Sequence, residues 1–563
     1  MKRNRWIGLV FISMAISLVI IDGTIVNTIF PAVIADLELT STQIQWVQES
    51  YVLVFASLLL VWGSLADRIG RRRLLMIGIT IFVGASIWAG LSTSADAMIL
   101  ARIVQGFGGA MVLPTTLSLV NANFEGRERG IAFAIWGSTI GGMVAIGPVL
   151  GGWLATDFSW RWAFNINAPL GILILIGLAI FVGESKVPQR AGGIDIVGAL
   201  ISVVMFSTLV FGLIEGRVYG WWDASDKNVF SIGDFAWPTD GISIIPISLA
   251  ISAVATVLFV LWERAREKAH KNVLLDLGLF KISSFRNGSL AALIISMGEF
   301  GLLFAIPLWL QNVGGLSAVS SGLVLLWLAG GAFLASGVGG ALSGKVSAAA
   351  QVRAGVVLEL LGVLGIALFA PTDGGWGAVA PFLLLYGIGV GLATAQLTGV
   401  IMVDVPPVKI GQASGSQSTV RQIGSALGIA VLGTALFTSV QSIGETKLEQ
   451  TSYVQSLPAE QRAGLVQEVS DIVVESAGGA LPKLGEATGG IGFKFGATAP
   501  ITEAQSAEVV TAGNEAFTQG VHITGYFAAG FLLLGLLSTF SLGGGNANRR
   551  KMTEAAKSAP TEG

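Results

Sequence analysis

Long apolar segments recur along the whole chain, and they limit its fold more than any other feature of the sequence. A helix needs about 20 mostly apolar residues to cross a bilayer. The first run begins at Trp6, directly after the basic segment 1–5, and continues to Phe30 without a small-residue cleavage site, so we interpret it as a spanning helix rather than a signal peptide. Fourteen such segments are predicted, at 6–30, 43–65, 74–94, 97–121, 130–155, 164–183, 194–215, 242–262, 288–311, 320–343, 354–371, 377–403, 413–440 and 520–543.

The composition agrees with an all-α membrane protein. Only 12% of the 563 residues are charged and 53% are hydrophobic, whereas about a quarter of the residues in a soluble domain are charged. A net charge of -2 argues against a nucleic acid as partner. The chain has no cysteine, and its two histidines, His270 and His522, are far apart in the sequence. The sequence therefore predicts neither a metal site nor a cofactor.

The basic residues predict the orientation in the membrane. An even number of spans places both termini on one side, and short cytoplasmic loops are enriched in Lys and Arg. If the termini are cytoplasmic, the inner segments hold 24 of the 33 basic residues, and the reverse orientation would place those 24 outside. Both termini are therefore predicted to be cytoplasmic. The inner segments are 1–5, 66–73, 122–129, 184–193, 263–287, 344–353, 404–412 and 544–563.

Two outer loops are longer than the others. Segment 217–241 contains three tryptophans, which favour the membrane–water interface. Segment 441–519 has ten acidic and four basic residues. Within it, the apolar spacing from Pro458 to Glu475 predicts a helix ended by Gly478-Gly479, and a second helix is predicted from Thr502 into the last span. This loop could cap the outer mouth or be an inert hairpin.

The inner loop after the second span carries Gly63, Asp67, Gly70 and Arg71. Its glycines permit a tight reversal, and Asp67 can face the positive N-terminal end of a neighbouring helix. Arg71 is expected to pair with Glu125 or Glu128. An ordinary basic inner loop is the alternative interpretation. The segment resembles the signature loop of the major facilitator superfamily, which implies a latch that closes the cytoplasmic side.

Arg102 lies inside the fourth predicted span, in the segment Arg102-Ile-Val-Gln105-Gly106. An arginine within the membrane costs about 2.5 kcal/mol or more on insertion scales, so it needs a partner or a wet cavity. The alternative is that its side chain reaches the outer surface. The segment resembles the second motif of the same superfamily, and this resemblance implies a role in proton transfer.

The fifth predicted span is rich in glycine. Small residues four positions apart let helices approach closely, and a proline bends the helix. Generic helix packing would explain the glycines alone. The arrangement is, however, similar to the motif of the exporting branches of the superfamily, which implies export. Its residues are Gly137, Gly141, Gly147, Pro148, Gly151 and Gly152.

Further segments extend the resemblance to nearly the whole chain. Asp22 begins the run Asp22-Gly-Thr-Ile-Val-Asn-Thr-Ile-Phe-Pro31, which resembles the first-helix motif of the fourteen-helix drug:proton antiporters of the EmrB/QacA-like branch. Segments 159–167 and 411–424 are also similar to that branch. The implied fold has two six-helix bundles with two intercalated helices. The implied domains are 1–193, 194–287 with the cytoplasmic linker, 288–543, and a tail at 544–563.

Four intramembrane residues are the predicted proton-coupling set. Helical rise places Asp22, Glu49 and Arg102 in the outer half of the membrane, where their side chains could converge, and Glu299 near its middle. Burial raises the pKa of a carboxyl group and a nearby arginine lowers it, so such a group can titrate as solvent access alternates. The alternatives are structural pairing of Asp22 with Arg102, pairing of Glu299 across helices, and contact of Glu49 with water. Glu359 and Asp404 are expected to be structural.

The predicted function is proton-coupled antiport that exports amphipathic, often cationic drugs across the bacterial cytoplasmic membrane by alternating access. Trp136, Phe300, Phe304 and Trp309 could line an apolar substrate cavity. A dedicated exporter of a lipid, sugar or biosynthetic product is the alternative on the same fold. A membrane enzyme or sensor lacks support from any catalytic motif. The predicted partners are protons, a small amphipathic substrate and the lipid bilayer, and a monomer is expected.

Overall fold

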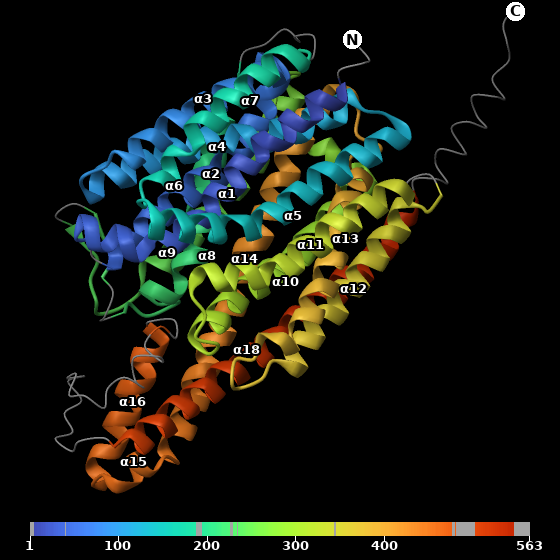
Figure 1. Cartoon of the computed structure of the whole chain (residues 1–563). Coiled ribbons are helices and arrows are strands. Elements are labelled where there is room, and N and C mark those ends of the chain that lie inside the picture. The colour runs from blue at the N-terminus through green and yellow to red at the C-terminus, as the bar shows by residue number, and fades with distance from the viewer. Residues whose placement is uncertain are drawn as a thin grey trace, which may run out of the picture.

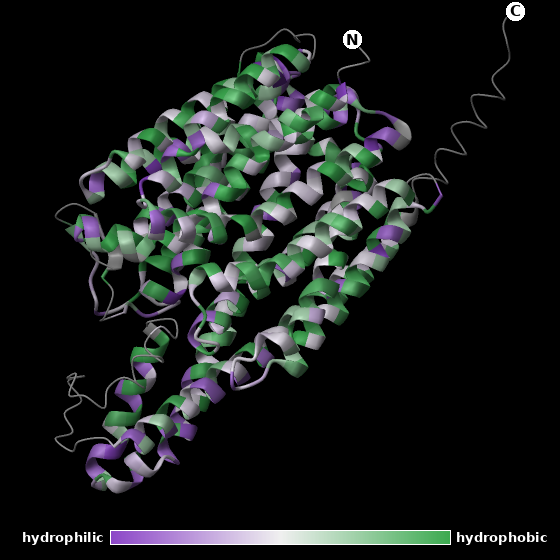
Figure 2. Ribbon diagram, in the orientation of Figure 1, coloured by the Kyte–Doolittle hydropathy of each residue, from purple (hydrophilic) through white to green (hydrophobic). Residues whose placement is uncertain are grey.

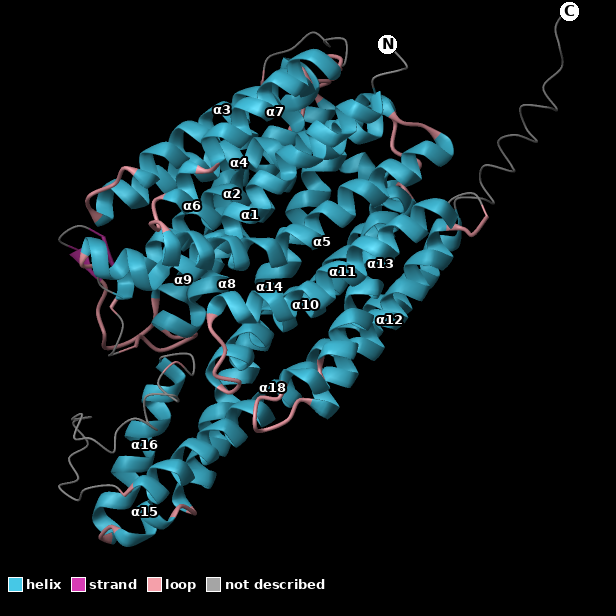
Figure 3. Ribbon diagram, viewed as in Figure 1, coloured by secondary structure: helices cyan, strands magenta, loops and turns pink. Residues whose placement is uncertain are grey.

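Helices make up most of the structure, a computed structural model that describes residues 5–39, 41–186, 194–225, 229–232, 235–342, 345–475, 479 and 502–544 (Figure 3). Two short strands, β1 (Ser231–Ile232) and β2 (Phe235–Ala236), pair antiparallel in the outer loop that the sequence predicts at 217–241. Hydrophobic residues run along the helices of the main body, and hydrophilic residues gather at the projecting end of the molecule (Figure 2).

The first half of the chain forms seven long helices and one short one. They are α1 (Arg5–Leu37), α2 (Ser41–Ile69), α3 (Arg71–Gly90), α4 (Ala95–Asn123), α5 (Gly126–Asp157), the short α6 (Trp162–Asn165), α7 (Asn167–Phe181) and α8 (Ile196–Tyr219).

The second half adds further long helices and several short ones. They are α9 (Ile244–Lys268), η2 (Leu277–Lys281), α10 (Ser283–Asn312), α11 (Ala318–Leu342), α12 (Ala348–Phe369), η3 (Trp376–Ala378), α13 (Ala380–Met402), η4 (Pro407–Lys409), α14 (Ile410–Glu449), α15 (Ser452–Ser456), α16 (Ala459–Glu475), α18 (Glu503–Thr539) and η6 (Phe540–Gly544).

Thirteen apolar helical segments within the described ranges are long enough to span a membrane, and each coincides with a predicted span. The remaining predicted span, 130–155, corresponds to α5, a helix of 32 residues that packs between α1 and α11. Some side chains of α5 lie outside the described residues. The total of fourteen spans therefore stays a prediction.

The long helices form two groups of six (Figure 1). Helices α1, α2, α3, α4, α5 and α7 pack together, as do α10, α11, α12, α13, α14 and α18, and the two groups meet mainly through α5 with α11 and α2 with α14. The two helices between the groups, α8 and α9, pack on each other, and α8 also contacts α2 and α14. This arrangement confirms the predicted pair of six-helix bundles with two helices between them. The predicted domain limits stay predictions, and 187–193 and 545–563 lie outside the described residues.

The outer segment after α14 projects from the main body as a helical stalk (Figure 1). The predicted helices are confirmed as α16 and the first part of α18, and Thr502 and Gln505 form a capping box at the start of α18. Apolar residues of α16, including Val469 and Val473, pack near Val509 of α18. Gly478 and 480–501 lie outside the described residues. The choice between cap and inert hairpin stays open.

The first and last described helices have their terminal ends opposite the stalk. The first turn of α1 and the last turn of α18 lie at one end of the main body, and the stalk leaves from the other (Figure 1). Near the first end, the Arg353 guanidinium donates to the backbone oxygen of Thr539 at 3.2 Å. This geometry agrees with the predicted placement of both termini on one side.

Glycines allow the second bundle to pack closely. A Cβ atom on Gly387 of α13 would overlap the backbone oxygen of Leu328 in α11, and one on Gly391 would overlap the Ala332 oxygen. Backbone atoms in two facing helices cannot move aside cheaply, so these positions need glycine. Gly330 of α11, by contrast, has no atom near the position of an added Cβ.

We expect Gly387→Ala to lower the thermal unfolding midpoint of the detergent-purified protein. Overpacking of this kind costs about 1–3 kcal/mol. Gly330→Ala is the matched control, because the same substitution in open space should leave the midpoint unchanged or raise it by improving helix propensity. Equal midpoints for the two variants would contradict the packing described for α11 and α13.

Candidate functional site

An ion pair buried within the first bundle is the centre of the candidate site. Arg102 of α4 donates from Nη1 to Oδ2 of Asp22 in α1 at 2.6 Å. Both side chains are completely buried. The structure therefore brings together two of the predicted proton-coupling residues. The pairing of Asp22 with Arg102, which the sequence offered as the alternative interpretation, is observed.

Neutral polar side chains complete the coordination of Asp22. Its Oδ1 accepts from Gln105 Nε2 at 2.7 Å and from Asn167 Nδ2 at 3.1 Å. Ser86 of α3 accepts from the same two amides, at 3.3 Å and 2.8 Å, and donates to the backbone oxygen of Phe164. Both oxygens of Asp22 are therefore hydrogen-bonded, and the amides hold its carboxyl group in place opposite Arg102.

Arg102 has a second set of contacts that hold it inside the membrane. Its Nε donates to the backbone oxygen of Val47 in α2 at 3.1 Å, and Nη2 lies 3.4 Å from Gln48 Oε1. The guanidinium carbon is 4.2 Å from the centroid of the Tyr51 ring, a cation–π contact. The alternative that Arg102 reaches the outer surface is therefore wrong.

Sequence reasoning did not identify the polar partners of the ion pair as site residues. Gln105 lies three positions after Arg102, so both face the same side of α4, and Asn167 ends the 159–167 segment. An amide inside an apolar span was the available signal for each. Ser86 and Tyr51 carry no such signal, because hydroxyl groups are common in spanning helices. Gln48 also carries an amide, but it lies near the start of its predicted span, where polar residues are common.

Segment 159–167 positions the α7 side of this cluster. Arg161 donates to Asp36 of α1 at 2.5 Å, and Trp160 donates to the same carboxylate at 3.1 Å. The Arg161 guanidinium also lies 4.3 Å from the centroid of the Trp160 ring. The hydrogen bond from Arg161 lowers the pKa of Asp36 below its usual range. These contacts fix the chain just before Asn167, whose amide reaches Asp22.

Glu49 does not join the ion pair, so the predicted convergence of all three residues is wrong for Glu49. Its carboxyl group instead lies near that of Glu215 in α8, close enough for the two groups to interact electrostatically. Glu49 directly follows Gln48 on α2, and adjacent residues on a helix point in different directions. Helical rise estimates the depth of a residue in the membrane but not the direction of its side chain. Glu215 was not identified from the sequence.

The second bundle contains a cluster of acidic side chains that has fewer charge and hydrogen-bond partners than Asp22. Glu299 of α10 is buried and lies 3.8 Å from Arg421 of α14, which agrees with the predicted pairing across helices. Tyr386 of α13 donates to the backbone oxygen of Glu299 at 2.9 Å. Glu359 of α12 is fully buried, and neither of its carboxyl oxygens has a hydrogen-bond partner among the described residues. One arginine thus faces two acids.

The predicted cavity aromatics divide into two pairs. Trp136 and Trp309 are buried, and their ring nitrogens donate to Thr116 and Thr518 at 3.2 Å and 3.1 Å. Phe300 and Phe304 are half-buried, and Phe304 lies 6.3 Å from Phe437, ring centroid to centroid. A shared substrate cavity for these four residues stays a prediction.

The glycine-rich α5 packs against both bundles. Added Cβ atoms on Gly147 and Gly151 would overlap Thr24 and Thr28 of α1, and one on Gly152 would overlap Val319 of α11. Gly322 of α11 packs next to Pro148 and Val149. Gly137 is buried. Gly141 belongs to α5, but its surroundings lie outside the described part of the structure. The small residues thus bring α5 close to the helix that carries Asp22.

The inner loop forms the predicted contact with a helix end. Asp67 Oδ2 accepts from the backbone nitrogen of Gly411, in the first turn of α14, at 2.9 Å. This contact links the two bundles at the end that is predicted to be cytoplasmic, and a carboxylate is favoured at a helix N-terminus. Gly63 lies so close to the Gly415 backbone that a Cβ atom would overlap it. The ends of α2 and α14 on this predicted cytoplasmic side are therefore in contact.

The predicted partner of Arg71 is corrected by the structure. Arg71 donates to Oδ1 of Asp67 at 2.7 Å and to Ser185 at 3.1 Å, whereas Glu128 pairs with Arg5 at 2.6 Å. Asp67 and Arg71 lie four residues apart around Gly70, whose φ of 109° favours glycine. This short-range pair keeps Asp67 aimed at α14.

Comparison with known proteins identifies the family to which this chain belongs. The family model described as Major Facilitator Superfamily matches residues 12–429. The chain belongs to this superfamily. The multidrug resistance protein Stp of Mycobacterium tuberculosis is 32% identical over 80% of this chain and 79% of its own length. The tetracenomycin C resistance and export protein of Streptomyces glaucescens is 28% identical over 86% and 85%.

A solved structure supports the same facilitator fold. The crystal structure of the human organic anion transporter MFSD10 aligns with a TM-score of 0.57 over 95% of this chain and 99% of that one, at 12% identity. At this identity the likeness concerns the fold. Among the described residues of this facilitator protein, no group of three or more His, Cys, Asp or Glu side chains could hold a metal ion.

The prediction that Asp67 helps to close the cytoplasmic side can be tested through its contact with α14. Because the native chain has no cysteine, Ser414→Cys introduces a single thiol at a fully buried position one turn into α14. We expect Asp67→Ala to speed thiol labelling from the cytoplasmic side about tenfold, since a hydrogen bond to a charged group contributes about 1.5–3 kcal/mol.

Asp67→Asn is the matched control for this labelling assay. Its amide oxygen can still accept from Gly411 but carries no charge for Arg71, so labelling at an intermediate rate is expected. Unchanged labelling in Asp67→Ala would show that the contact does not hold the cytoplasmic side closed.

Proposed function

We propose that this protein exports small drug-like molecules from the bacterial cytoplasm in exchange for protons. The observation that carries the proposal is the completely buried ion pair of Asp22 and Arg102 in the first bundle. Charges are rare inside a membrane protein and generally mark an ion or proton pathway. Asp22 is the carboxylate we assign to the principal proton, and Arg102 is its counter-ion.

Protonation of Asp22 would change the energetics of the whole cluster. A neutral Asp22 no longer compensates Arg102, and leaving one partner of a buried pair uncompensated costs about 3–5 kcal/mol. The guanidinium would keep its contacts with Val47, Gln105 and Tyr51. This imbalance would favour a rearrangement of α1 relative to α4. Proton binding and helix movement are thereby coupled without any covalent step.

The position of Asp22 relates this change to alternating access. Thr24, one half-turn further along α1, packs directly against Gly147 of α5. Helix α5 in turn packs against α11 of the second bundle through Gly152 and Val319. A displacement of α1 would therefore be transmitted to the interface between the bundles. The contact of Asp67 with α14 would have to open in the inward-facing state.

Glu299 is the proposed second proton or substrate site. It lies in the packed interior of the second bundle near Arg421, and Glu359 adds a second buried acid to that cluster. When its proton leaves, a carboxyl group carries a negative charge, and a bound cationic substrate can compensate that charge. This suits exchange of a proton for a cationic substrate.

The substrate class follows from the relatives only in part. Stp is named for multidrug resistance, and the Streptomyces relative for resistance to tetracenomycin C and its export. The first name supports export of varied amphipathic drugs. The second supports the alternative, a dedicated exporter of one biosynthetic product. We favour drug export, driven by the proton gradient without a cofactor, by a monomer in the cytoplasmic membrane.

Reconstituted vesicles with an imposed pH gradient test the proposal. Ethidium, a fluorescent lipophilic cation, serves as the transported probe. We expect Asp22→Asn to reduce proton-driven ethidium transport at least about tenfold, the effect of about 1.4 kcal/mol on one step. The amide can keep hydrogen bonds with Gln105 and Arg102 but cannot bind and release the proton.

Glu460→Gln, in the exposed first turn of α16, is the matched control and should transport at the wild-type rate. Gel filtration and ethidium binding establish that both variants fold. Wild-type transport by a folded Asp22→Asn variant would remove Asp22 from the mechanism. Equal transport with and without the gradient in the wild type would contradict proton coupling itself.

A further inference from the structure

The start of α14 depends on groups from other parts of the chain. Its N-cap residue is Lys409, whose side chain has only donors and cannot accept from the first backbone nitrogens of the helix. Lysine is also unfavourable at this position, because the positive end of the helix dipole prefers negative charge. Yet the first turn must be held accurately, since its Gly411 nitrogen donates to Asp67 of the first bundle.

The linker between α9 and α10, residues 269–282, supplies the missing groups. Gln412, in the first turn of α14, accepts at Oε1 from the backbone nitrogen of Asp276 at 3.1 Å and donates from Nε2 to the backbone oxygen of Val273 at 3.2 Å. The Asp276 carboxylate pairs with Lys409. One side chain of α14 thus holds the linker backbone at two points, and an acid of the linker compensates the lysine at the helix start.

The linker is itself an ordered part of the second bundle. Asp276 accepts from the backbone nitrogen of Gly278 at 2.8 Å, and this contact caps the short helix η2. Leu279 of η2 is completely buried. Phe280 packs on Phe285 of α10 at 5.5 Å between ring centroids. These contacts keep Asp276 in place beside the start of α14.

The inserted helices hold the other end of the linker. Glu263 of α9, which is 1% exposed, accepts from the backbone nitrogen of Leu274 at 3.1 Å. Arg266 Nε donates to the backbone oxygen of Asn272 at 2.7 Å and pairs with Asp195, at the start of α8, at 3.0 Å. The linker is therefore attached to α8 and α9 at its beginning and to α14 at its middle.

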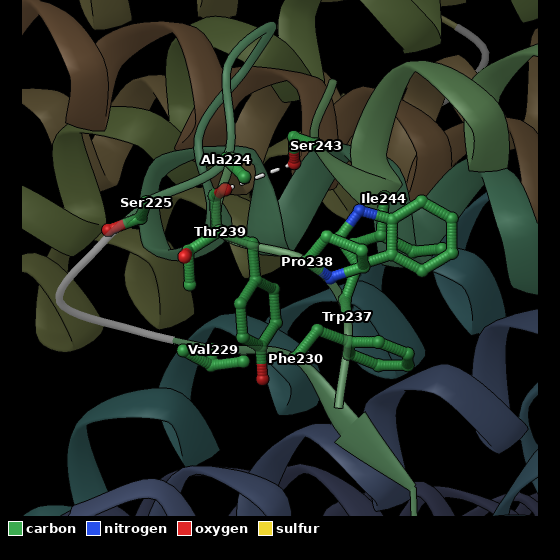
Figure 4. A pocket seen from close by; sticks show the side chains of 10 residues that line it. Ala224, Ser225, Val229, Phe230, Trp237, Pro238, Thr239, Ser243 and Ile244 are labelled. Carbon is green, nitrogen blue, oxygen red and sulfur yellow. Dashed lines mark hydrogen bonds between the residues drawn. The ribbon is translucent and has the colours of Figure 1, made fainter. Parts of the chain in front are cut away.

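Helices α8 and α9 form a unit that can anchor the linker. Ser252 of α9 donates to the backbone oxygen of Met205 in α8 at 2.8 Å. At the outer end, Ser243 donates to the Tyr219 backbone oxygen at 3.0 Å, beside a small pocket lined in part by Trp237 (Figure 4). Hydrogen bonds thus join the two helices along their length, and the linker leaves from the end opposite this pocket.

We propose that the linker positions the first turn of α14 for its contact with Asp67, with Gln412 and Asp276 as the positioning residues. The inserted helices thereby help to close the side predicted to be cytoplasmic. Because the linker ties α8 and α9 to α14, these helices move with the second bundle when Asp67 separates from Gly411. The inference rests on the closing role of Asp67 and deepens the proposed alternating access, without depending on protons or substrate.

Thiol labelling of Ser414→Cys, in the purified protein without drug or pH gradient, tests this role. Gln412→Ala removes both side-chain bonds to the linker, and we expect it to speed labelling at least about threefold, the effect of one net hydrogen bond. In the Asp67→Ala background the same substitution should add no further acceleration, because Gln412 acts through Asp67. Gln461→Ala, at an exposed position of α16, is the matched control and should leave the labelling rate unchanged.

Unchanged labelling in Gln412→Ala would overturn the proposal. Equal acceleration with and without Asp67 would also overturn it, since a general loosening of α14 acts in both backgrounds. If Gln412→Ala does not fold, Asp276→Asn replaces it, because the amide loses the charge that compensates Lys409, and the same two comparisons apply. No transport is measured, so failure here is distinguishable from failure of proton exchange, which Asp22→Asn tests.

Discussion

The arrangement of the first bundle depends on one constraint, the need to compensate the charge of Arg102 inside the membrane. Five helices contribute to this compensation, through Asp22, the Val47 oxygen with Gln48, Ser86, Gln105 and Asn167. The 159–167 segment and the α5 glycines hold α7 and α1 where these groups can meet. Because a buried charge without a partner is costly, the cluster fixes the relative positions of the helices, and in the proposed mechanism a proton on Asp22 would change them.

The two buried acidic sites differ in their partners. Asp22 has a cation and two amide donors. In the second bundle, Glu299 and Glu359 lie near a single arginine, and Glu359 has no hydrogen-bond partner among the described residues. The first site is thus a closed network that joins several helices, whereas the second leaves acidic oxygens without a hydrogen-bond donor.

Much of the fold follows from the sequence, because membrane insertion is governed by local composition. Apolar length located the helices, and the distribution of Lys and Arg predicts their orientation, with both ends of the chain on one side. The glycines of α5 and the Asp67 loop could be recognised since close helix contact and helix-end geometry need particular residues. Side-chain direction was harder. The same depth was estimated for Glu49 and Arg102, yet they face different partners. Arg71 has its partner four residues away rather than on the next loop. Glu215 was missed because a single acid near a span end resembles an interfacial residue.

The central claim, exchange of substrate for protons, is tested most directly by reversing the driving force. Vesicles that contain the wild-type protein are loaded with ethidium at equal pH inside and outside, and a pH-sensitive dye reports the internal pH. As ethidium leaves down its own gradient, the account predicts that protons enter and the interior acidifies. Efflux of ethidium through the protein at constant internal pH would contradict it.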